Sequence, residues 1–361
     1  MDQLKKFYKN KKVFITGHTG FKGSWLTSVL LKYGAKVIGY SQNDSKKKNY
    51  EMFVNYKKVK NIYANILDFK KLKQSVQRYK PSIIFHLAAQ PLVSESYINP
   101  LKTFKTNMVG SINVMEATRF CSSIKSLVMI TSDKCYHNKE IKRGYKEEDI
   151  LGGDDPYSAS KAAAEIAYNS FNRSFFYKNK KIGVASARAG NVIGGGDWSK
   201  DRLIPDCVKS WSKKKRVILR NPKSTRPWQH VLEAVYGYLL LAQNLKKNKK
   251  LHGEVFNFGP SNNKNYNVLY LVKLMKNSWK NVFWKVNKYN KKSFFESNLL
   301  KLNCNKAKSI LKWRCILNFK ETINMVTNWY KDYYLKPQKI YLTTTNQIKN
   351  YEKLLTEREI K

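Results

Sequence analysis

Acidic residues are scarce in this chain of 361 residues. It contains 25 Asp and Glu against 69 Lys and Arg, which gives a formal net charge of +44 at pH 7. So large a charge can serve to bind a polyanion such as nucleic acid, but it can equally reflect a compositional preference for lysine. The lysines are spread along the whole chain in short clusters, without a helix-turn-helix, zinc-finger or RNP pattern. We therefore expect no specific nucleic-acid partner, although the charge would attract a small anionic substrate.

Cysteines and long apolar runs are also few. The five cysteines are odd in number and include no CxxC pair, which argues against a disulfide framework or a metal site and predicts reduced thiols in a cytoplasmic protein. The apolar runs fall far short of the ~20 residues of a membrane-spanning helix. The first ten residues are charged and do not resemble a signal peptide. We expect no membrane partner and a large core, in one large domain or two coupled ones.

A strand, a glycine-rich turn and a helix are predicted near the start. Residues 12–16 are apolar and β-branched, and residues 24–33 have helical spacing that ends before Gly34. The glycines between them stand three residues apart, which permits a tight turn and the close approach of a pyrophosphate to a helix N-terminus. A plain strand-to-helix turn is the alternative. The predicted dinucleotide-binding turn comprises Gly17, His18, Thr19, Gly20, Phe21, Lys22 and Gly23.

The choice between NAD and NADP stays open. An acidic residue near the end of the second strand, residues 36–40, would favour NAD by binding the ribose hydroxyls. The first acid after this strand is Asp44, preceded by Ser41 and Gln42. The lysines at 46–48 could instead accept a 2′-phosphate.

Further βα units predict a doubly wound parallel sheet. Strands are expected at residues 61–64, 82–87, 126–131, 182–187 and 254–259. We predict an α/β, Rossmann-type NAD(P)-binding domain over residues 1–188, joined by a returning segment at about 227–260. Residues 189–226 and 261–335 would form a smaller α/β lid for the substrate. Residues 336–361 would be a polar, Lys-rich tail that forms a loosely attached helix.

Acid–base groups gather at two points of this pattern. Ser132, Asp133 and Lys134 follow a predicted buried strand, and Tyr157 and Lys161 stand four residues apart on a helix, so they share one face. Adjacent residues on a strand point to opposite faces, so Asp133 and Lys134 reach one site only if the chain turns there. The alternative is a structural ion pair between the two.

Two other features have open interpretations. Asn107 lies within a predicted long helix, residues 99–120, and asparagine is a poor helix former. It is either a polar core residue with its hydrogen bonds satisfied, or a residue that bends the helix and holds a catalytic water. Residues 225–231 bring arginine, tryptophan and histidine together, which suits a diphosphate and a base. A surface turn with a packed tryptophan is the alternative.

Together these motifs resemble the extended short-chain dehydrogenase/reductase family. The resemblance rests on Gly17-x-x-Gly20-x-x-Gly23, on residues 87–90 and on Tyr157-x-x-x-Lys161. Within this family, residues 17–26, 131–136, 155–158, 201–206 and 226–231 are most similar to CDP-glucose 4,6-dehydratases. The similarity runs from about Lys11 to about Tyr334. Lys134 is the discriminating residue, because related nucleotide-sugar dehydratases typically place a glutamate there.

The resemblance implies dehydration of CDP-glucose to CDP-4-keto-6-deoxyglucose, with internal hydride transfer through a tightly held NAD, as a step toward the deoxysugars of surface polysaccharide. Tyr157 would take the 4-hydroxyl proton, with its pKa lowered by Lys161 and the nicotinamide, and Ser132 would hydrogen-bond the same oxygen. Lys134 would remove the C5 proton, and Asp133 would protonate the departing 6-hydroxyl. Alternatives are another nucleotide-sugar 4,6-dehydratase, a 4-epimerase, or a basic nucleic-acid binder on the same scaffold.

The resemblance also assigns binding residues and assembly. Further cofactor residues are Asn65, Ile66, Leu87, Ala88, Ala89, Gln90 and Thr106. Substrate residues are Asn191, Arg202, Leu203, Ile204, Arg226 and His230. Asn65 departs from the family, which commonly has an aspartate toward the adenine ring. A homodimer or higher homo-oligomer is expected, formed through the helices that follow Pro100 and Pro156.

Overall fold

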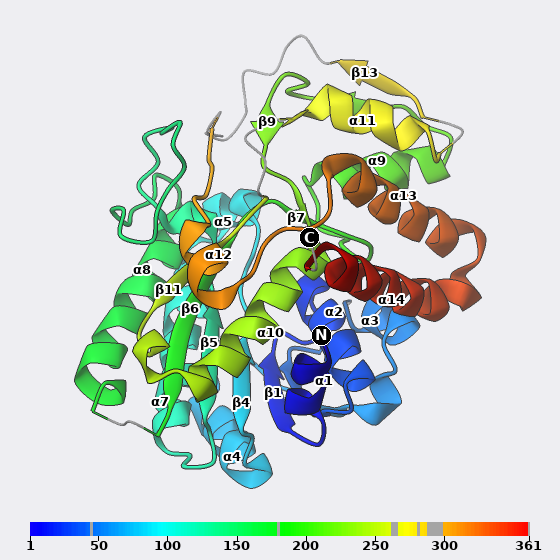
Figure 1. Ribbon diagram of the computed structural model, residues 1–361. Coiled ribbons are helices and arrows are strands. Elements are labelled where there is room, and N and C mark those ends of the chain that lie inside the picture. The colour runs from blue at the N-terminus through cyan, green and yellow to red at the C-terminus, as the bar shows by residue number, and fades with distance from the viewer. Residues whose placement is uncertain (44–45, 179–180, 261–265, 280–281, 287–298, 360–361) are drawn as a thin grey trace.

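A seven-stranded parallel sheet forms the centre of the computed structural model, which describes residues 1–43, 46–178, 181–260, 266–279, 282–286 and 299–359. The strand order is β11-β6-β5-β4-β1-β2-β3 (Figure 1). The strands are β1 (Lys12–Thr16), β2 (Lys36–Ser41), β3 (Lys60–Tyr63), β4 (Ile83–His86), β5 (Ser126–Ile130), β6 (Gly183–Ala189) and β11 (Val255–Phe258). The predicted doubly wound α/β sheet is confirmed. The order reverses between β1 and β4, and ligands bind at such a crevice, outside the carboxyl ends of the strands.

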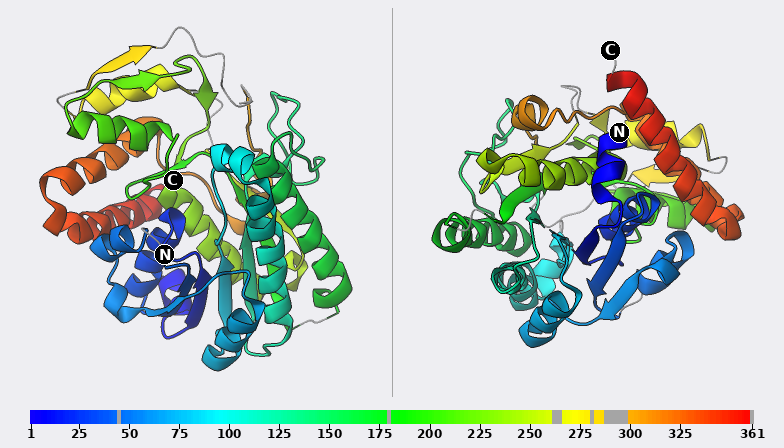
Figure 2. Two further views of the ribbon diagram at one scale, coloured as in Figure 1. Left: turned by 180° about the vertical axis from the view of Figure 1, so that it is seen from behind. Right: turned by 60° about the horizontal axis from the view of Figure 1, so that its bottom comes forward.

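Helices cover both faces of the sheet. α1 (Asp2–Tyr8), α2 (Phe21–Lys32) and α10 (Val231–Lys247) lie on one face, and α4 (Phe69–Tyr79), α7 (Gly110–Arg119) and α8 (Pro156–Phe171) on the other (Figures 1 and 2). Side chains of β1 alternate between two cores: Val13 and Ile15 belong to the first, and Phe14 belongs to the second. Both faces are therefore buried, which explains why the strands are apolar throughout.

A smaller layer lies above the carboxyl ends of the strands (Figure 1). It is built from α9 (Leu203–Ser212), β8 (Val217–Leu219), β9 (Thr225–Arg226), β12 (Tyr266–Asn267), α11 (Val268–Lys276), β13 (Trp284–Val286) and α13 (Phe319–Leu335). β8 pairs with β13 in parallel, and β9 pairs with β12 antiparallel. These pairings join segments on either side of the returning helix α10. The proposed division into two domains stays a prediction.

The C-terminal tail is not loosely attached, contrary to the expectation from its polar composition. It forms α14 (Ile340–Glu359), which packs against α13 and against α3 (Lys46–Phe53). Ile340, Ile348 and Tyr351 are buried. Its apolar side chains are spaced widely among lysines and threonines, so the buried stripe is narrow. No helix in the described part of the chain is long and apolar enough to cross a bilayer.

Candidate active site at the carboxyl ends of the strands

The glycine turn between β1 and α2 is tightly packed. Gly17 has φ +74°, and a Cβ there would lie 2.7 Å from the backbone N of Ala88 at the end of β4. A Cβ on Gly23 would overlap the carbonyl of Gly17. The turn therefore needs glycine at both positions, and it presents bare backbone at the start of α2. This geometry suits a pyrophosphate seated on a helix N-terminus.

His18 turns its ring away from this backbone. The ring is buried, with Nδ1 2.9 Å from Ser41 Oγ and Nε2 2.9 Å from Asn61 Oδ1. Burial lowers the pKa of His18 to about 4. The neutral ring thus braces the turn against β2 and β3, and only the backbone of His18 is available to a dinucleotide.

The cofactor-side residues after β2 and β3 are largely occupied by local contacts. Asn65 accepts a hydrogen bond from the backbone N–H of Leu67 at 3.0 Å, and Ile66 packs under Gly110. Lys47 lies over the ring of Tyr63, 4.8 Å from its centroid. Asp44 falls outside the described residues. The choice between NAD and NADP stays a prediction.

Asn107 joins the end of β4 to α8. Its Oδ1 accepts the backbone N–H of Gln90 at 2.8 Å, and its Nδ2 donates to the Gln90 carbonyl and to Ser160 Oγ. The predicted helix 99–120 is interrupted at this point, because Lys105–Val109 form a π-helical turn between α6 (Pro100–Phe104) and α7. Asn107 is therefore a satisfied polar core residue, and Thr106 lies half-buried on the same turn.

The chain turns directly after β5. Asp133–Cys135 form a 3-10 turn, and Ser132 caps it by accepting the N–H of Lys134 at 3.3 Å. Asp133 and Lys134 therefore do not alternate as they would on a strand. Ser132 and Asp133 are buried, and Lys134 is half-buried. Burial raises the pKa of Asp133, while Lys134, Ser132 and Lys22 lower it.

Tyr157 and Lys161 face this turn from α8. The helix begins at Pro156, with Asp155 accepting the N–H of Ser158 at 3.0 Å. Burial raises the pKa of Tyr157 to about 12, and the groups that oppose this rise are Ser132 and Arg202. The lowered pKa of Tyr157 that the resemblance implied is therefore not produced by the side chains of this protein alone. Burial also lowers the pKa of Lys161 to about 8.

The predicted substrate residues separate into two groups. Asn191 donates to Asp133 Oδ2 at 3.5 Å, and Arg202 pairs with Asp197 at 2.8 Å while its charge acts on Tyr157. Arg226 lies half-buried in β9, opposite Tyr266 of β12.

The other group lies deeper. Ile204 is buried in the core at the start of α9, next to the half-buried Leu203. His230 is buried too, where it caps α10 and meets Trp25 at a centroid distance of 5.8 Å. Burial lowers the pKa of His230 to about 3. This position favours a structural contribution.

Comparison with known proteins assigns the chain to a family. A profile of the family described as GDP-mannose 4,6 dehydratase matches residues 14–326. The chain belongs to this family. The match confirms the resemblance predicted from the motifs and makes the chain a member of a family of enzymes.

Relatives with established names lie within the same group. The chain is 41% identical over 353 residues to CDP-glucose 4,6-dehydratase from Salmonella typhimurium, covering 96% of this chain and 98% of the relative. It is 26% identical over 344 residues to UDP-glucose 4-epimerase from Mycoplasma genitalium, covering 90% and 97%. The epimerase Mth375 from Methanothermobacter thermautotrophicus has a similar fold, with a TM-score of 0.82 at 24% identity over 94% of this chain and 97% of that structure.

A buried ionic network behind the acid–base groups is a feature that the sequence reasoning missed. Arg188 of β6 pairs with Glu165 of α8 at 2.9 Å, and Glu165 also accepts hydrogen bonds from Thr131 and from Ser186. The network ties β5, β6 and α8 together directly beneath Lys161. The sequence did contain a signal for this network, because Lys161 and Glu165 stand four residues apart and therefore share one helix face.

Lys22, predicted as a cofactor residue, is directed toward the same centre. Its pKa is lowered to about 8, chiefly by burial and also by the charges of Lys161 and Arg202, while Asp133 and Asp197 act in the opposite direction. Charged groups from the glycine turn, the β5 turn and α8 therefore share one electrostatic environment.

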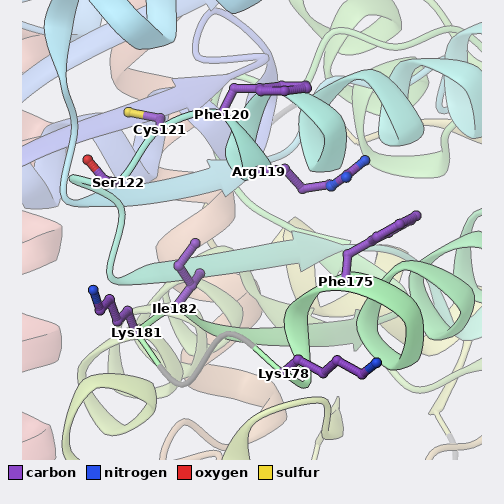
Figure 3. A pocket seen from close by; sticks show the side chains of 8 residues that line it. All are labelled: Arg119, Phe120, Cys121, Ser122, Phe175, Lys178, Lys181 and Ile182. Atoms are coloured by element: carbon purple, nitrogen blue, oxygen red, sulfur yellow. The ribbon is translucent and has the colours of Figure 1, made fainter.

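An open groove of about 640 Å³ lies elsewhere on the molecule (Figure 3). It is lined by residues 119–122 at the end of α7, by Phe175, Lys178 and Lys181 after α8, and by Ile182 directly before β6. Arg119 lies over the ring of Phe175, 3.8 Å from its centroid. Since β6 begins there and the acid–base groups follow the strand ends, the groove does not belong to the candidate site.

Proposed function

We propose that this chain dehydrates CDP-glucose to CDP-4-keto-6-deoxyglucose, using NAD. The observation that carries the proposal is the turn at Ser132-Asp133-Lys134, which faces Tyr157 and Lys161 at the end of β5. The 41% identity to a CDP-glucose 4,6-dehydratase over nearly the whole of both chains supports the choice of nucleotide. A step toward deoxysugars of surface polysaccharide is the corresponding biological role.

The glycine turn and the ends of β3 and β4 would hold the cofactor. Solved structures of similar fold include a UDP-glucuronic acid 4-epimerase with bound NAD. Bound NAD would accept a hydride from C4 of the sugar and return it to C6. The chain contributes the bare backbone at Gly17 to Gly23 and the small side chains of Ala88 and Ala89.

Oxidation at C4 would begin with Tyr157. Its ionised hydroxyl would take the proton of the sugar 4-hydroxyl, and Ser132 would hydrogen-bond the same oxygen. Ionisation has to overcome the raised pKa of Tyr157, so the Ser132 hydroxyl and the Arg202 cation matter, because both lower this pKa. A resulting 4-ketone acidifies the C5 proton.

Water loss would then use the adjacent pair. Lys134 would remove the C5 proton, and Asp133 would give its proton to the departing 6-hydroxyl. The raised pKa of Asp133 supports this assignment, because an acid has to retain its proton until the step. A 4-epimerase needs no such pair, which favours dehydration over epimerisation.

Substrate contacts are proposed for residues of the layer above the strand ends. Arg202 and Arg226 would meet the diphosphate, since guanidinium groups suit phosphate oxygens. Asn191, Leu203, Ile204 and His230 would shape the pocket, the last two through packing.

A homodimer is proposed through the face that carries α5 (Val93–Ile98), α6, α7 and α8. Several large apolar side chains are exposed there, including Ile98 at 70%, Leu101 at 67% and Ile166 at 59%. Exposed apolar residues grouped in this way favour association. The five cysteines are free thiols, which supports a cytoplasmic location.

Mass spectrometry of the reaction with CDP-glucose tests the proposal. The expected product has lost one water and shows the alkaline absorbance of a 4-keto-6-deoxy sugar. Product from UDP-, GDP- or dTDP-glucose but not from CDP-glucose would contradict the nucleotide assignment. A sugar of unchanged mass but altered configuration would indicate an epimerase, and salt-sensitive DNA binding without a dinucleotide would indicate the nucleic-acid alternative.

A further inference from the structure

We infer that Gly190 and Asn191 form a seat that fixes the carboxyl group of Asp133 where it protonates the departing 6-hydroxyl. Gly190 contributes by having no side chain, and Asn191 contributes its amide. Both act through Asp133 and are positioning residues. This role rests on the proposed function, in which Asp133 is the acid whose position Gly190 and Asn191 fix.

The Asp133 carboxyl group occupies the space that a side chain at residue 190 would fill. A Cβ built on Gly190 meets three nearest atoms, and all of them belong to this carboxyl: Oδ2, Cγ and, at 2.5 Å, Oδ1. The backbone of Gly190 is not in the left-handed region. Its conformation is therefore open to any residue, and the contact with Asp133 is what excludes a side chain.

Each carboxyl oxygen of Asp133 also has its own donor. Ser132 Oγ donates to Oδ1 at 3.0 Å, and Asn191 Nδ2 approaches Oδ2 at 3.5 Å. Asn191 has φ +48°, a conformation that asparagine adopts more readily than most residues. The turn at 190–191 thus delivers a small backbone surface and an amide to the same carboxyl group.

The backbone of the seat cannot easily retreat. Gln229 donates through Nε2 to the carbonyls of Gly190 at 3.3 Å and Phe258 at 2.7 Å, and its own N–H donates to the Asn191 carbonyl. Gln229 is buried, and it pairs with Val192 between β10 (Gln229–His230) and β7 (Val192–Ile193). The end of the short Asp133 side chain is therefore the part that would move if residue 190 gained a methyl group.

Displacing Asp133 should affect water loss far more than oxidation at C4. In water loss the Asp133 carboxyl O–H gives its proton to O6, and the C6–O6 bond breaks to release water. Lys134 takes the C5 proton, and the electrons of that C–H bond form the C5–C6 double bond. Oxidation at C4 uses Tyr157, Lys161 and Ser132, none of which belongs to the seat. Of these, Ser132 donates to Asp133 Oδ1 at 3.0 Å, so a much smaller effect on this step is expected.

The Gly190→Ala variant tests this selectivity. Overall dehydration should fall by about 100-fold, the lower range for loss of a general acid. In a single turnover the absorbance of reduced nicotinamide should still appear, at a rate reduced far less than overall dehydration, and then persist. Gly259→Ala is the matched control, because residue 259 follows the neighbouring strand β11 and a Cβ there would meet nothing closer than Cys304 Sγ at 3.5 Å. The control should keep the wild-type rate.

A double variant shows whether Gly190 acts through Asp133. Adding Gly190→Ala to Asp133→Asn should cost no further activity, since coupled sites are not additive. A full additional loss, an equal loss of C4 oxidation, or a wild-type rate for Gly190→Ala would each overturn the inference. If the wild-type chain dehydrates no nucleotide sugar, the proposed function fails separately. A crystal structure of Gly190→Ala then decides the seat, with Asp133 expected to be rotated away and an unmoved carboxyl overturning it.

Discussion

Burial controls the protonation of the acid–base residues. Loss of solvent is the largest cause of the raised pKa of Asp133, of the fall for Lys161 to about 8 and of the rise for Tyr157 to about 12. The shift favours Asp133 as an acid. It opposes Tyr157, which has to ionise, so Ser132 and Arg202 are important because they lower its pKa.

Lys161→Met should stabilise the free chain at neutral pH. The folded pKa of about 8 lies below the ordinary value of 10.5, so the unfolded chain binds more protons between these values. The free-energy cost of burying the charged Lys161 is therefore fully present below pH 8. This cost disappears as the pH rises toward 10.5. We expect a gain on the order of 3 kcal/mol at pH 7, measured by urea unfolding, that fades with rising pH.

The exposed Lys70→Met on α4 is the control for this measurement and should give no such pH-dependent gain. An equal gain at pH 7 and pH 10.5 would contradict a titration effect of Lys161. Activity should be lost in Lys161→Met whatever its stability.

Sequence reasoning named the candidate acid–base residues but not the residues that hold them in place. The spacing of Tyr157 and Lys161 and the run Ser132-Asp133-Lys134 were visible as local patterns. Gly190 and Arg188 were not, because their importance comes from contacts with residues 57 and 23 positions away in the chain. Local spacing does not contain such contacts.

At the scale of the element, the strands of the sheet were predicted closely, whereas two helical features were not. β1 was predicted to the residue and the other strands of the sheet to within one or two, because parallel strands buried on both faces give compact apolar runs. α10 was missed, since a helix that is apolar all round has no amphipathic period. At Lys105–Val109 a bend at Asn107 was one of two alternatives, but the π-helical form of the interruption was not predicted.

The glycine turn and the end of β4 fit together as two elements. Gly17→Ala should abolish dinucleotide binding, because a Cβ at residue 17 meets the Leu87–Ala88 backbone within 3 Å. Gly34→Ala is the matched control. It has a similar φ of +72°, but its Cβ would meet only Lys9 Cγ at 3.8 Å. Both changes carry the cost of left-handed backbone, about 1 kcal/mol.

Titration calorimetry with NAD separates the two variants. Gly34→Ala should bind with wild-type affinity and unfold at slightly lower denaturant. Loss of binding in both variants would show that backbone strain alone accounts for the effect and that the close approach to β4 is not required.

At the scale of the whole molecule, the C-terminal helix connects layers that are distant in sequence. Tyr351 of α14 donates to Glu233 at the start of α10 at 2.7 Å, and Glu352 pairs with Lys32 of α2. Arg358 pairs with Glu321 of α13. The described lysines of the tail are exposed, whereas its buried contacts come from residues spread along the helix, which is why composition suggested a loose attachment.

Tyr351→Ala should therefore destabilise the whole chain. Removing a buried aromatic side chain typically costs about 3–5 kcal/mol, and here the change also removes a donor to the buried Glu233. Tyr341→Ala on the same helix is the control, because Tyr341 is 43% exposed and should cost less than about 0.5 kcal/mol. Thermal and urea unfolding would measure both. Similar midpoints for the two variants would contradict a docked tail.

The position of α14 also imposes an order on synthesis. Trp329 Nε1 donates to Thr344 Oγ1 of this helix, and Trp329 packs on Gly195, whose carbonyl accepts Trp25 Nε1 from the helix of the glycine turn. The residues of α14 leave the ribosome after every strand of the sheet. A nascent chain would therefore carry every strand of the sheet before α14 can pack against α13 and α3.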